Sequence, residues 1–194
     1  MSKETNNIDL IIDKDFLSGY EIGEKLGEGG GGGVYAAYHK NLRKKVVIKQ
    51  LKNKYSIEAK KRTEVDILKN LRHSYIPNVI DYFEKDDVAY TIMDYIEGKS
   101  FGQLLKEGKK FSAKEVLKYY EQLCEAVAYL HSQKIPVIHG DIKPDNIMLT
   151  PDDHICLIDF NISGISENGK AYTDGYTPGY SAPEQYEQYK IILG

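Results

Sequence analysis

The sequence has few of the residues that define several common classes of protein. It has no tryptophan and only two cysteines, Cys124 and Cys156, which form no CxxC pattern and have no His/Cys cluster around them. A disulfide framework and a zinc site are therefore disfavoured, and a reducing, cytoplasmic location is expected. Because both cysteines stand in apolar runs, we expect both to be buried.

Long apolar runs and a strong excess of one charge are also missing. No window approaches the length of a membrane span, and residues 1–16 lack the basic start and long apolar core of a signal peptide. The net charge of −3 gives no electrostatic reason to expect a nucleic-acid or membrane partner. The apolar fraction of 41% and charged fraction of 28% are ordinary for a soluble protein, and 194 residues suffice for one domain or two small lobes.

Hydrophobic periodicity divides the chain into two unlike parts. The first part predicts one helix over 56–73 and strands over 20–26, 34–39, 45–51, 77–83 and 88–96. The second part predicts a short helix over 100–108, a long helix that begins at Ser112, and short strands over 146–150 and 154–159. Ser112 and Glu115 form a capping box. The long helix carries one broad apolar stripe, which consists of Val116, Leu117, Tyr120, Leu123, Cys124, Val127 and Leu130.

The stretch "GEGGGGGVY", residues 27–35, has the composition of a linker. It also fits GxGxxGxV through Gly27, Gly29, Gly32 and Val34, although a run of glycines meets that pattern almost trivially. Its context is more informative, because a strand precedes it and another follows, whereas a dinucleotide-binding fingerprint needs a helix there. Glycines in such a hairpin let backbone N–H groups approach phosphate closely. The glycines at the tip predict an unusually mobile loop.

A lysine ends the apolar strand "VVIK". Lys49 could be an edge residue that extends to water, or it could pair with phosphate oxygens at the floor of a cleft. The second role needs a carboxylate partner on the following helix. Glu64 is our candidate, and Glu58 and Asp66 compete with it on sequence alone.

Two polar clusters follow in the second part. "HGDIKPDNIML" brings Asp141, Lys143 and Asn146 together in a stretch where Pro144 excludes a helix interior. A polar loop between apolar segments is how a scaffold presents catalytic side chains, although a plain turn is the alternative. "LIDFNIS" places Asp159 at a strand end, where it could cap a turn or, facing Asn146, bind magnesium through oxygen ligands.

These motifs occur in the order found in the protein kinase family, which the chain therefore resembles. The stretches "LGEGG", "IKPDNIML" and "PGYSAPEQY" are most similar to those of the eukaryotic-like Ser/Thr kinases of bacteria. The resemblance extends from about 20 to 186 and includes "TPGYSAPEQY", which is similar to the end of a kinase activation segment. It implies an α+β, bilobal fold with a five-stranded antiparallel N-lobe plus one helix and an incomplete, mainly helical C-lobe. The implied divisions are an extension over 1–19, an N-lobe over 20–93, and a hinge with partial C-lobe over 94–194.

The resemblance also implies a role for each matching residue. The enzyme would use ATP and Mg²⁺ to phosphorylate Ser or Thr of a protein substrate, with Asp141 accepting the hydroxyl proton, Lys143 neutralising the moving phosphoryl group and Lys49 paired to Glu64. Asn146 and Asp159 would bind the metal. The nucleotide would contact Gly27, Gly29, Gly32, Val34, Val47, Lys49, Met93, Asp94, Tyr95, Ile96 and Met148. The activation segment would include Thr173, Thr177 and Glu184.

The sequence departs from the family pattern at several positions. Gly140 stands where many kinases carry an Arg that pairs with a phosphorylated activation loop, which argues against that mode of switching. Asn161 replaces the glycine after "DF", and Val47 replaces a smaller residue above adenine. The chain also ends soon after Glu184. We therefore expect a truncated kinase whose long helix lacks apolar cover, and self-association that covers it.

Three functions remain open from the sequence. The first is an active Ser/Thr protein kinase, because every polar residue of the core motifs is present. The second is a pseudokinase or catalytically weak module that binds nucleotide. The third is a small-molecule phosphotransferase, which "TPGYSAPEQY" disfavours because that stretch resembles a peptide-substrate feature.

Overall fold

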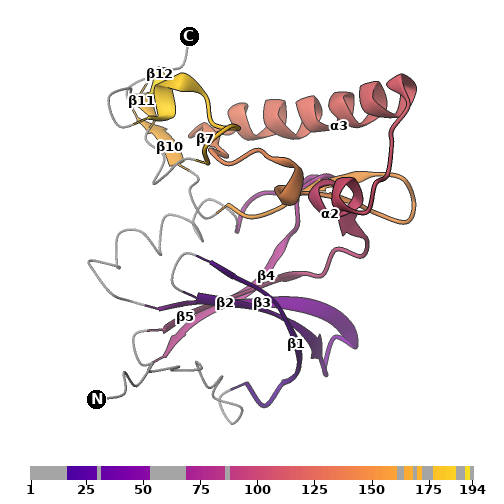
Figure 1. The fold of residues 1–194 in the computed structure, drawn as a ribbon. Coiled ribbons are helices and arrows are strands. Elements are labelled where there is room, and N and C mark those ends of the chain that lie inside the picture. Colours follow the sequence, from indigo (N-terminus) through magenta and orange to yellow (C-terminus); the bar gives the residue numbers. More distant parts are fainter. Residues whose placement is uncertain are drawn as a thin grey trace, which may run out of the picture.

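A computed structural model describes residues 17–29, 32–52, 69–85, 88–160, 164–167, 170–171, 177–186 and 191–192. They form two lobes, with a curved sheet in one and most of the helical structure in the other (Figure 1). Most of the helix predicted over 56–73 lies outside the described residues. The glycine tip at 30–31, Glu64, Asn161, Thr173 and the side chain of Glu184 also lie outside the described part of the chain.

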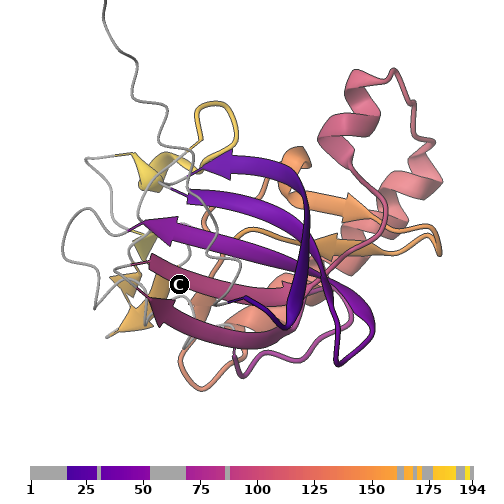
Figure 2. The same ribbon diagram turned by 90° about the horizontal axis from the view of Figure 1, so that it is seen from below.

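The first lobe is an antiparallel sheet with the strand order β1-β2-β3-β5-β4, which confirms the predicted five-stranded lobe (Figure 2). Alternating and β-branched residues form its strands, and most of the buried residues of the sheet lie on the central strand β3 and on its neighbour β5. The strands are β1 (Tyr20–Gly29), β2 (Gly32–His39), β3 (Lys44–Lys52), β4 (Val79–Lys85) and β5 (Val88–Asp94).

One face of this sheet forms a compact core. Val46, Ile48 and Ile92 are completely buried there, and Leu17, which precedes β1, packs against them with an exposed fraction of only 1%. Each fully buried aliphatic side chain stabilises the fold by roughly 1.5–3 kcal/mol. The packed part of the lobe therefore includes residues that precede its first strand.

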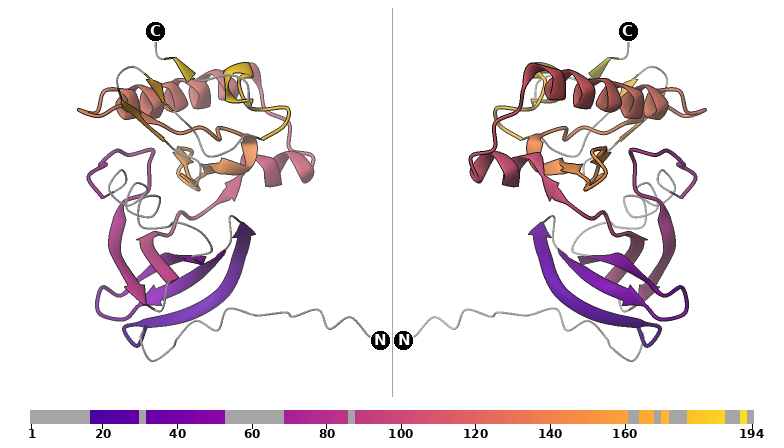
Figure 3. Two further views of the ribbon diagram at one scale, coloured as in Figure 1. Left: turned by 90° about the vertical axis from the view of Figure 1, so that its left-hand side faces the viewer. Right: turned by 90° about the vertical axis from the view of Figure 1, so that its right-hand side faces the viewer.

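The second lobe contains two helices, α2 (Phe101–Lys106) and α3 (Ala113–His131), as the sequence predicts. Figure 3 shows α3 on the side of this lobe turned away from the five-stranded sheet. The predicted capping box is confirmed, because Glu115 N–H donates to Ser112 Oγ and the Glu115 carboxylate accepts from Ser112 N–H. None of the helices in the described part of the chain has the length and hydropathy required to span a bilayer.

Short strands and turns surround the helices. The predicted pair at 146–159 is present as β8 and β9, which form a three-stranded sheet with β6, and another sheet has the order β12-β11-β10-β7. No periodic signal in the sequence marks the elements after Phe160. These remaining elements are β6 (Lys99–Ser100), β7 (Val137–Ile138), η1 (Pro144–Asn146), β8 (Ile147–Leu149), β9 (Ile155–Leu157), β10 (Gly164–Glu167), β11 (Lys170–Ala171), η2 (Pro183–Gln185) and β12 (Ile191–Ile192).

The buried face of α3 differs from the predicted apolar stripe. The helix buries Tyr119, Gln122, Ala126 and Leu130 against the lobe. Most of the stripe points to solvent, because at 100° per residue its centre lies in the sector beside the buried face, and Leu130 is the one residue that belongs to both. The exposed members of the stripe are Val116, Leu117, Tyr120 and Cys124. We expected α3 to expose apolar residues, and among the described residues it does.

The two cysteines differ, and the prediction for one of them is wrong. Cys156 is buried in β9, and burial raises the pKa of its thiol to about 12. Cys124 is exposed because it lies in the uncovered sector of α3.

Candidate active site

The glycine stretch forms the hairpin that its context predicted. Gly27 lies opposite Val34, and Gly29 lies opposite Gly32, where β1 and β2 pair. Irregular register in β1 between Ile22 and Gly27 bends the strand toward this end. The hairpin therefore places backbone, rather than bulky side chains, at the end of the sheet beside Lys49, which pairs with Val34 from β3.

Lys49 is the buried cation of the site. It is only 6% exposed, and its Nζ lies 3.5 Å from Asp159 Oδ1 across the junction of the lobes. A buried ammonium group needs an opposite charge because leaving water is costly. The edge-lysine alternative is thus wrong, since Lys49 stands in the central strand β3. Its predicted partner, Glu64, lies outside the described residues.

The segment after β5 connects the lobes and is fixed by hydrogen bonds. The Asp94 carboxylate accepts from Asn78 Nδ2 at 2.7 Å, from Asn78 N at 3.2 Å and from Lys44 Nζ at 2.9 Å. Burial acts to raise the pKa of Asp94, but these hydrogen bonds outweigh it and hold the pKa below its ordinary value. Met93 lies opposite Val47, and Tyr95 and Ile96 are half-buried as the strand leads out of the sheet.

On the side of the second lobe, the paired strands β8 and β9 lie where the two lobes meet. Met148, half-buried, lies opposite Cys156 on β9 and Ser100 on β6. The predicted nucleotide-contacting residues thus come from β1, β2, β3, β5, the connecting segment and β8, which meet where the lobes join.

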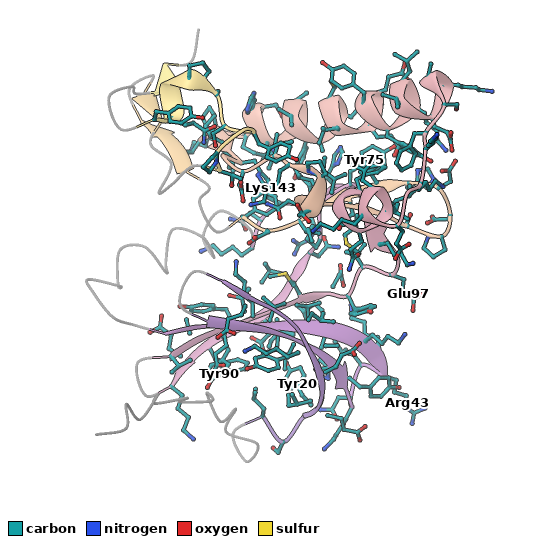
Figure 4. The ribbon with its side chains drawn as sticks, in the orientation of Figure 1. Tyr20, Arg43, Tyr75, Tyr90, Glu97 and Lys143 are labelled. Atoms are coloured by element: carbon teal, nitrogen blue, oxygen red, sulfur yellow. The ribbon has the colours of Figure 1, made fainter. Side chains whose placement is uncertain are left out.

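Asp141 is the centre of a network of charged and polar groups. Its Oδ2 lies 2.7 Å from Lys143 Nζ and accepts from Asn146 Nδ2 at 2.9 Å, while its Oδ1 accepts from the Thr177 hydroxyl at 2.6 Å. Burial acts to raise the pKa of Asp141, but Lys143 and Thr177 outweigh it and lower the pKa overall. Figure 4 shows Lys143 in the second lobe, below α3. Asp141 is therefore ionised at neutral pH and can accept hydrogen bonds from hydroxyl groups.

The pair of Asn146 and Asp159 fits a hard divalent cation. Ile158 N–H donates to the Asn146 carbonyl at 2.9 Å, so the two residues lie at adjacent strand ends. The Asn146 amide nitrogen donates to Asp141, which leaves the Asn146 Oδ1 as the side-chain oxygen that could bind a metal together with the Asp159 carboxylate. Asp159 adopts a φ of 65°, a left-handed conformation that Asp tolerates better than most residues. No group of three His, Cys, Asp or Glu suited to a metal occurs among the described residues. Phosphate and water would complete the shell, as Mg²⁺ prefers.

Comparison with known proteins shows the family to which the chain belongs. The sequence pattern of the protein kinase domain matches residues 20–191. The chain belongs to the protein kinase family. It is similar to Aurora kinase A-A of Xenopus laevis, with 35% identity over 88% of this chain and 42% of the relative. A probable serine/threonine-protein kinase of Clostridium acetobutylicum shares 32% identity over 86% of this chain and 26% of its own length. The carbon catabolite-derepressing protein kinase of Candida glabrata is 29% identical over 93% of this chain and 30% of its own length. The chain thus spans less than half of these relatives.

The candidate site includes residues that the sequence alone did not predict. His139 is buried, with an exposed fraction of 3%, and it accepts from Asp141 N–H at Nδ1 and lies 3.1 Å from the Ile158 carbonyl at Nε2. Burial lowers the pKa of His139 to about 4, so the ring is neutral. In the sequence, only its position two residues before Asp141 could have indicated that His139 belongs to the site.

Asn78 and Gln185 are two further residues that we did not predict. Asn78 fixes Asp94, and Gln185 Nε2 donates to the Gly140 carbonyl at 2.7 Å. Both contacts join residues far apart in the chain, and no local pattern in the sequence marks them.

Proposed function

We propose that this chain transfers the γ-phosphoryl group of ATP to a Ser or Thr hydroxyl of a protein substrate. The observation that carries the proposal is the hydrogen bond from the Thr177 hydroxyl to Asp141 Oδ1 at 2.6 Å. An alcohol donor already occupies one oxygen of this carboxylate, and Lys143 Nζ lies within 3.1 Å of the same hydroxyl. The geometry supports a site that binds a hydroxyl group between an anionic base and a cation.

In the proposed reaction the substrate oxygen attacks the γ-phosphorus. The new O–P bond forms as the bond from phosphorus to the β–γ bridging oxygen breaks, ADP departs with that electron pair, and the hydroxyl proton passes to Asp141. Lys143 offsets the negative charge on the moving phosphoryl group, and Lys49 holds the remaining phosphates. Bound Mg²⁺, held by Asn146 and Asp159, would neutralise phosphate charge. The contribution of the protein is positioning and electrostatics.

The same proposal extends to the origin, location and partners of the chain. The similarity to a clostridial kinase supports a bacterial, eukaryotic-like Ser/Thr kinase, and the composition supports a cytoplasmic location. A protein is the proposed substrate, and neither a nucleic-acid nor a membrane partner is proposed.

A second candidate is a nucleotide-binding module with little turnover. The exposed apolar face of α3 favours it, because the lobe that carries Asp141 has an uncovered side at Val116, Leu117 and Tyr120. A lobe packed on one side holds its catalytic loop less firmly.

Transfer of labelled phosphate to a generic protein substrate tests the two functions. The wild type is compared with Asp141→Asn and with the matched control Asp152→Asn, which changes an exposed turn residue. We expect Asp141→Asn to lower transfer by at least about 10²-fold, the range of general base catalysis, and Asp152→Asn to leave it unchanged. Equal transfer by wild type and Asp141→Asn would refute the role of Asp141. A wild type that binds ATP with Mg²⁺ but transfers nothing would favour the binding module.

A further inference from the structure

The side-chain amide of Gln185 links two separate parts of the site. Its Nε2 donates to the Gly140 carbonyl at 2.7 Å, and its Oε1 accepts from Ala182 N–H at 3.1 Å. Gln185 ends the short turn η2, whereas Gly140 immediately precedes Asp141 in the catalytic loop. One neutral side chain thus connects the end of the activation segment to the backbone beside the base.

The backbone at Asp141 is held at three successive points. Asp141 N–H donates to His139 Nδ1 at 3.2 Å, and the Asp141 carbonyl accepts from Asn146 Nδ2 at 2.9 Å. The third point is the Gly140 carbonyl that Gln185 binds. His139 and Asn146 belong to the catalytic loop itself, so Gln185 differs from them in fixing the loop to another segment.

Gly140 needs such a contact because of its conformation. Its φ is 81°, in the left-handed region that glycine adopts without steric cost. Glycine is also the residue with the most backbone freedom to lose on folding. A hydrogen bond to its carbonyl therefore restricts the peptide that leads into Asp141.

A second link joins the same two segments. Thr177 donates its hydroxyl proton to Asp141, and Thr177 N–H donates to Ser181 Oγ at 2.7 Å. Residues 177–186 thus contact the catalytic loop through Thr177, at the Asp141 carboxylate and at Lys143, and through Gln185, at the Gly140 carbonyl. Together these contacts fix the position and the direction of the carboxylate.

We propose that Gln185 is a positioning residue that orients Asp141 through the Gly140 carbonyl, and that it does so without a phosphate group. The inference rests on the proposed kinase activity. Gly140 has no side chain to pair with a phosphorylated residue, whereas the amide of Gln185 is uncharged and needs no modification to bind Ala182 N–H and the Gly140 carbonyl. The link between the activation segment and the catalytic loop therefore forms without phosphorylation, and we expect phosphatase treatment to leave the activity unchanged.

Two substitutions separate the bonds of Gln185. Gln185→Leu removes both, while Gln185→Glu keeps an acceptor for Ala182 N–H but replaces the donor with a carboxylate oxygen that repels the Gly140 carbonyl. The matched control is Gln133→Leu, because Gln133 Nε2 also donates to a backbone carbonyl, that of Tyr129, at 2.8 Å. Each variant is assayed for kcat, KM for ATP and melting temperature.

We expect both Gln185 variants to lose about 10- to 10²-fold in kcat, the cost of misplacing a catalytic group by a fraction of an ångström to one ångström. We expect KM for ATP to stay unchanged, because Gln185 binds the Gly140 carbonyl and Ala182 N–H, neither of which belongs to the residues assigned to the nucleotide, and Gln133→Leu to keep the wild-type kcat. The pH profile gives a signature that a merely structural role would not. As pH falls toward the carboxyl pKa of about 4.3, the introduced carboxyl gains a proton to donate, so the kcat of Gln185→Glu relative to wild type rises.

The outcomes distinguish this inference from the proposed function. Wild-type kcat in Gln185→Leu, or a ratio for Gln185→Glu that does not change with pH, would overturn the positioning role. Loss of wild-type activity after phosphatase treatment would overturn the claim that no phosphate is needed. An inactive wild type would refute the kinase activity alone. In that case amide hydrogen exchange over residues 139–146 decides, since faster exchange in Gln185→Leu than in Gln133→Leu supports the link and equal exchange refutes it.

Discussion

Lys44 Nζ lies 2.9 Å from Asp94 Oδ1, so the first residue of β3 is paired with the last residue of β5. Asn78, which precedes β4, donates two more hydrogen bonds to the other oxygen of the same carboxylate. One side chain thus connects three segments where the lobes meet. Removing it affects the stability of the first lobe and the angle at which the second lobe leaves it.

Replacing Asn78 by alanine tests this connection. We expect Asn78→Ala to lower the free energy of unfolding by about 1 kcal/mol, the usual net value of a partly exposed hydrogen bond. Asn41→Ala, in the exposed turn after β2, is the matched control and should change stability little. Denaturant unfolding of the three proteins measures the difference, and equal midpoints would contradict the role of Asn78.

The same carboxylate predicts a pH dependence. The folded-state pKa of Asp94 lies below its ordinary value, so the unfolded state binds the proton more readily. The contribution of Asp94 is therefore fully present above the unfolded pKa of about 3.9 and is lost as pH falls through the lower folded pKa. The stability gap between wild type and Asp94→Asn should narrow across that acidic window. A gap that stays constant there would show that the Asp94 charge contributes nothing.

Lys49 is predicted to be essential for binding nucleotide. Lys49→Met keeps an unbranched side chain that is one atom shorter and removes the charge that faces Asp159. At a concentration of ATP·Mg²⁺ about 100 times its Kd, the wild type should gain roughly 2.7 kcal/mol in stability by mass action, and Lys49→Met should gain much less. Lys45→Met is the control, because Lys45 pairs with Glu97 at the exposed end of the same strand. A thermal shift equal to the wild type in Lys49→Met would remove Lys49 from the phosphate site.

The uncovered sector of α3 predicts association between molecules. Leu117 and Tyr120 are 61% and 62% exposed, and contiguous apolar surface of this kind tends to be buried by a partner. We expect sedimentation at micromolar concentration to show oligomers of the wild type, and Leu117→Glu with Tyr120→Glu to shift it toward monomer. Lys114→Glu, on an exposed position of the same helix, controls for added negative charge. A folded wild-type monomer would refute this prediction.

The sequence predicted what depends on local patterns. Alternation indicated the strands of the first lobe, Ser112 and Glu115 indicated the start of α3, and the polar residues around Pro144 indicated a loop that carries Asp141, Lys143 and Asn146. Each of those features depends on residues that are close together in the chain, so the local sequence is sufficient to predict it.

Other features depend on contacts between distant residues and could not be read from the sequence. The apolar stripe of α3 was identified, but the helix buries the side that carries Tyr119 and Gln122. Gln122 Oε1 accepts from Ile155 N–H at 2.9 Å, which makes a polar residue part of the packed face. The hydrogen bonds of Asn78 and Gln185 likewise join segments that are far apart in the chain and meet only in the folded protein, so the sequence alone does not predict them.

Leu17 has a practical consequence for any shortened version of this protein. The protein kinase pattern begins at residue 20, but the Leu17 side chain is almost fully enclosed by the first lobe. Truncating a buried leucine costs about 2–5 kcal/mol, and an ordinary domain has only about 5–15 kcal/mol in total. A fragment that begins at residue 20 would therefore have a cavity in the core of the first lobe and little free energy of unfolding left. The part of the chain that folds as a unit is thus longer than the part that matches the family.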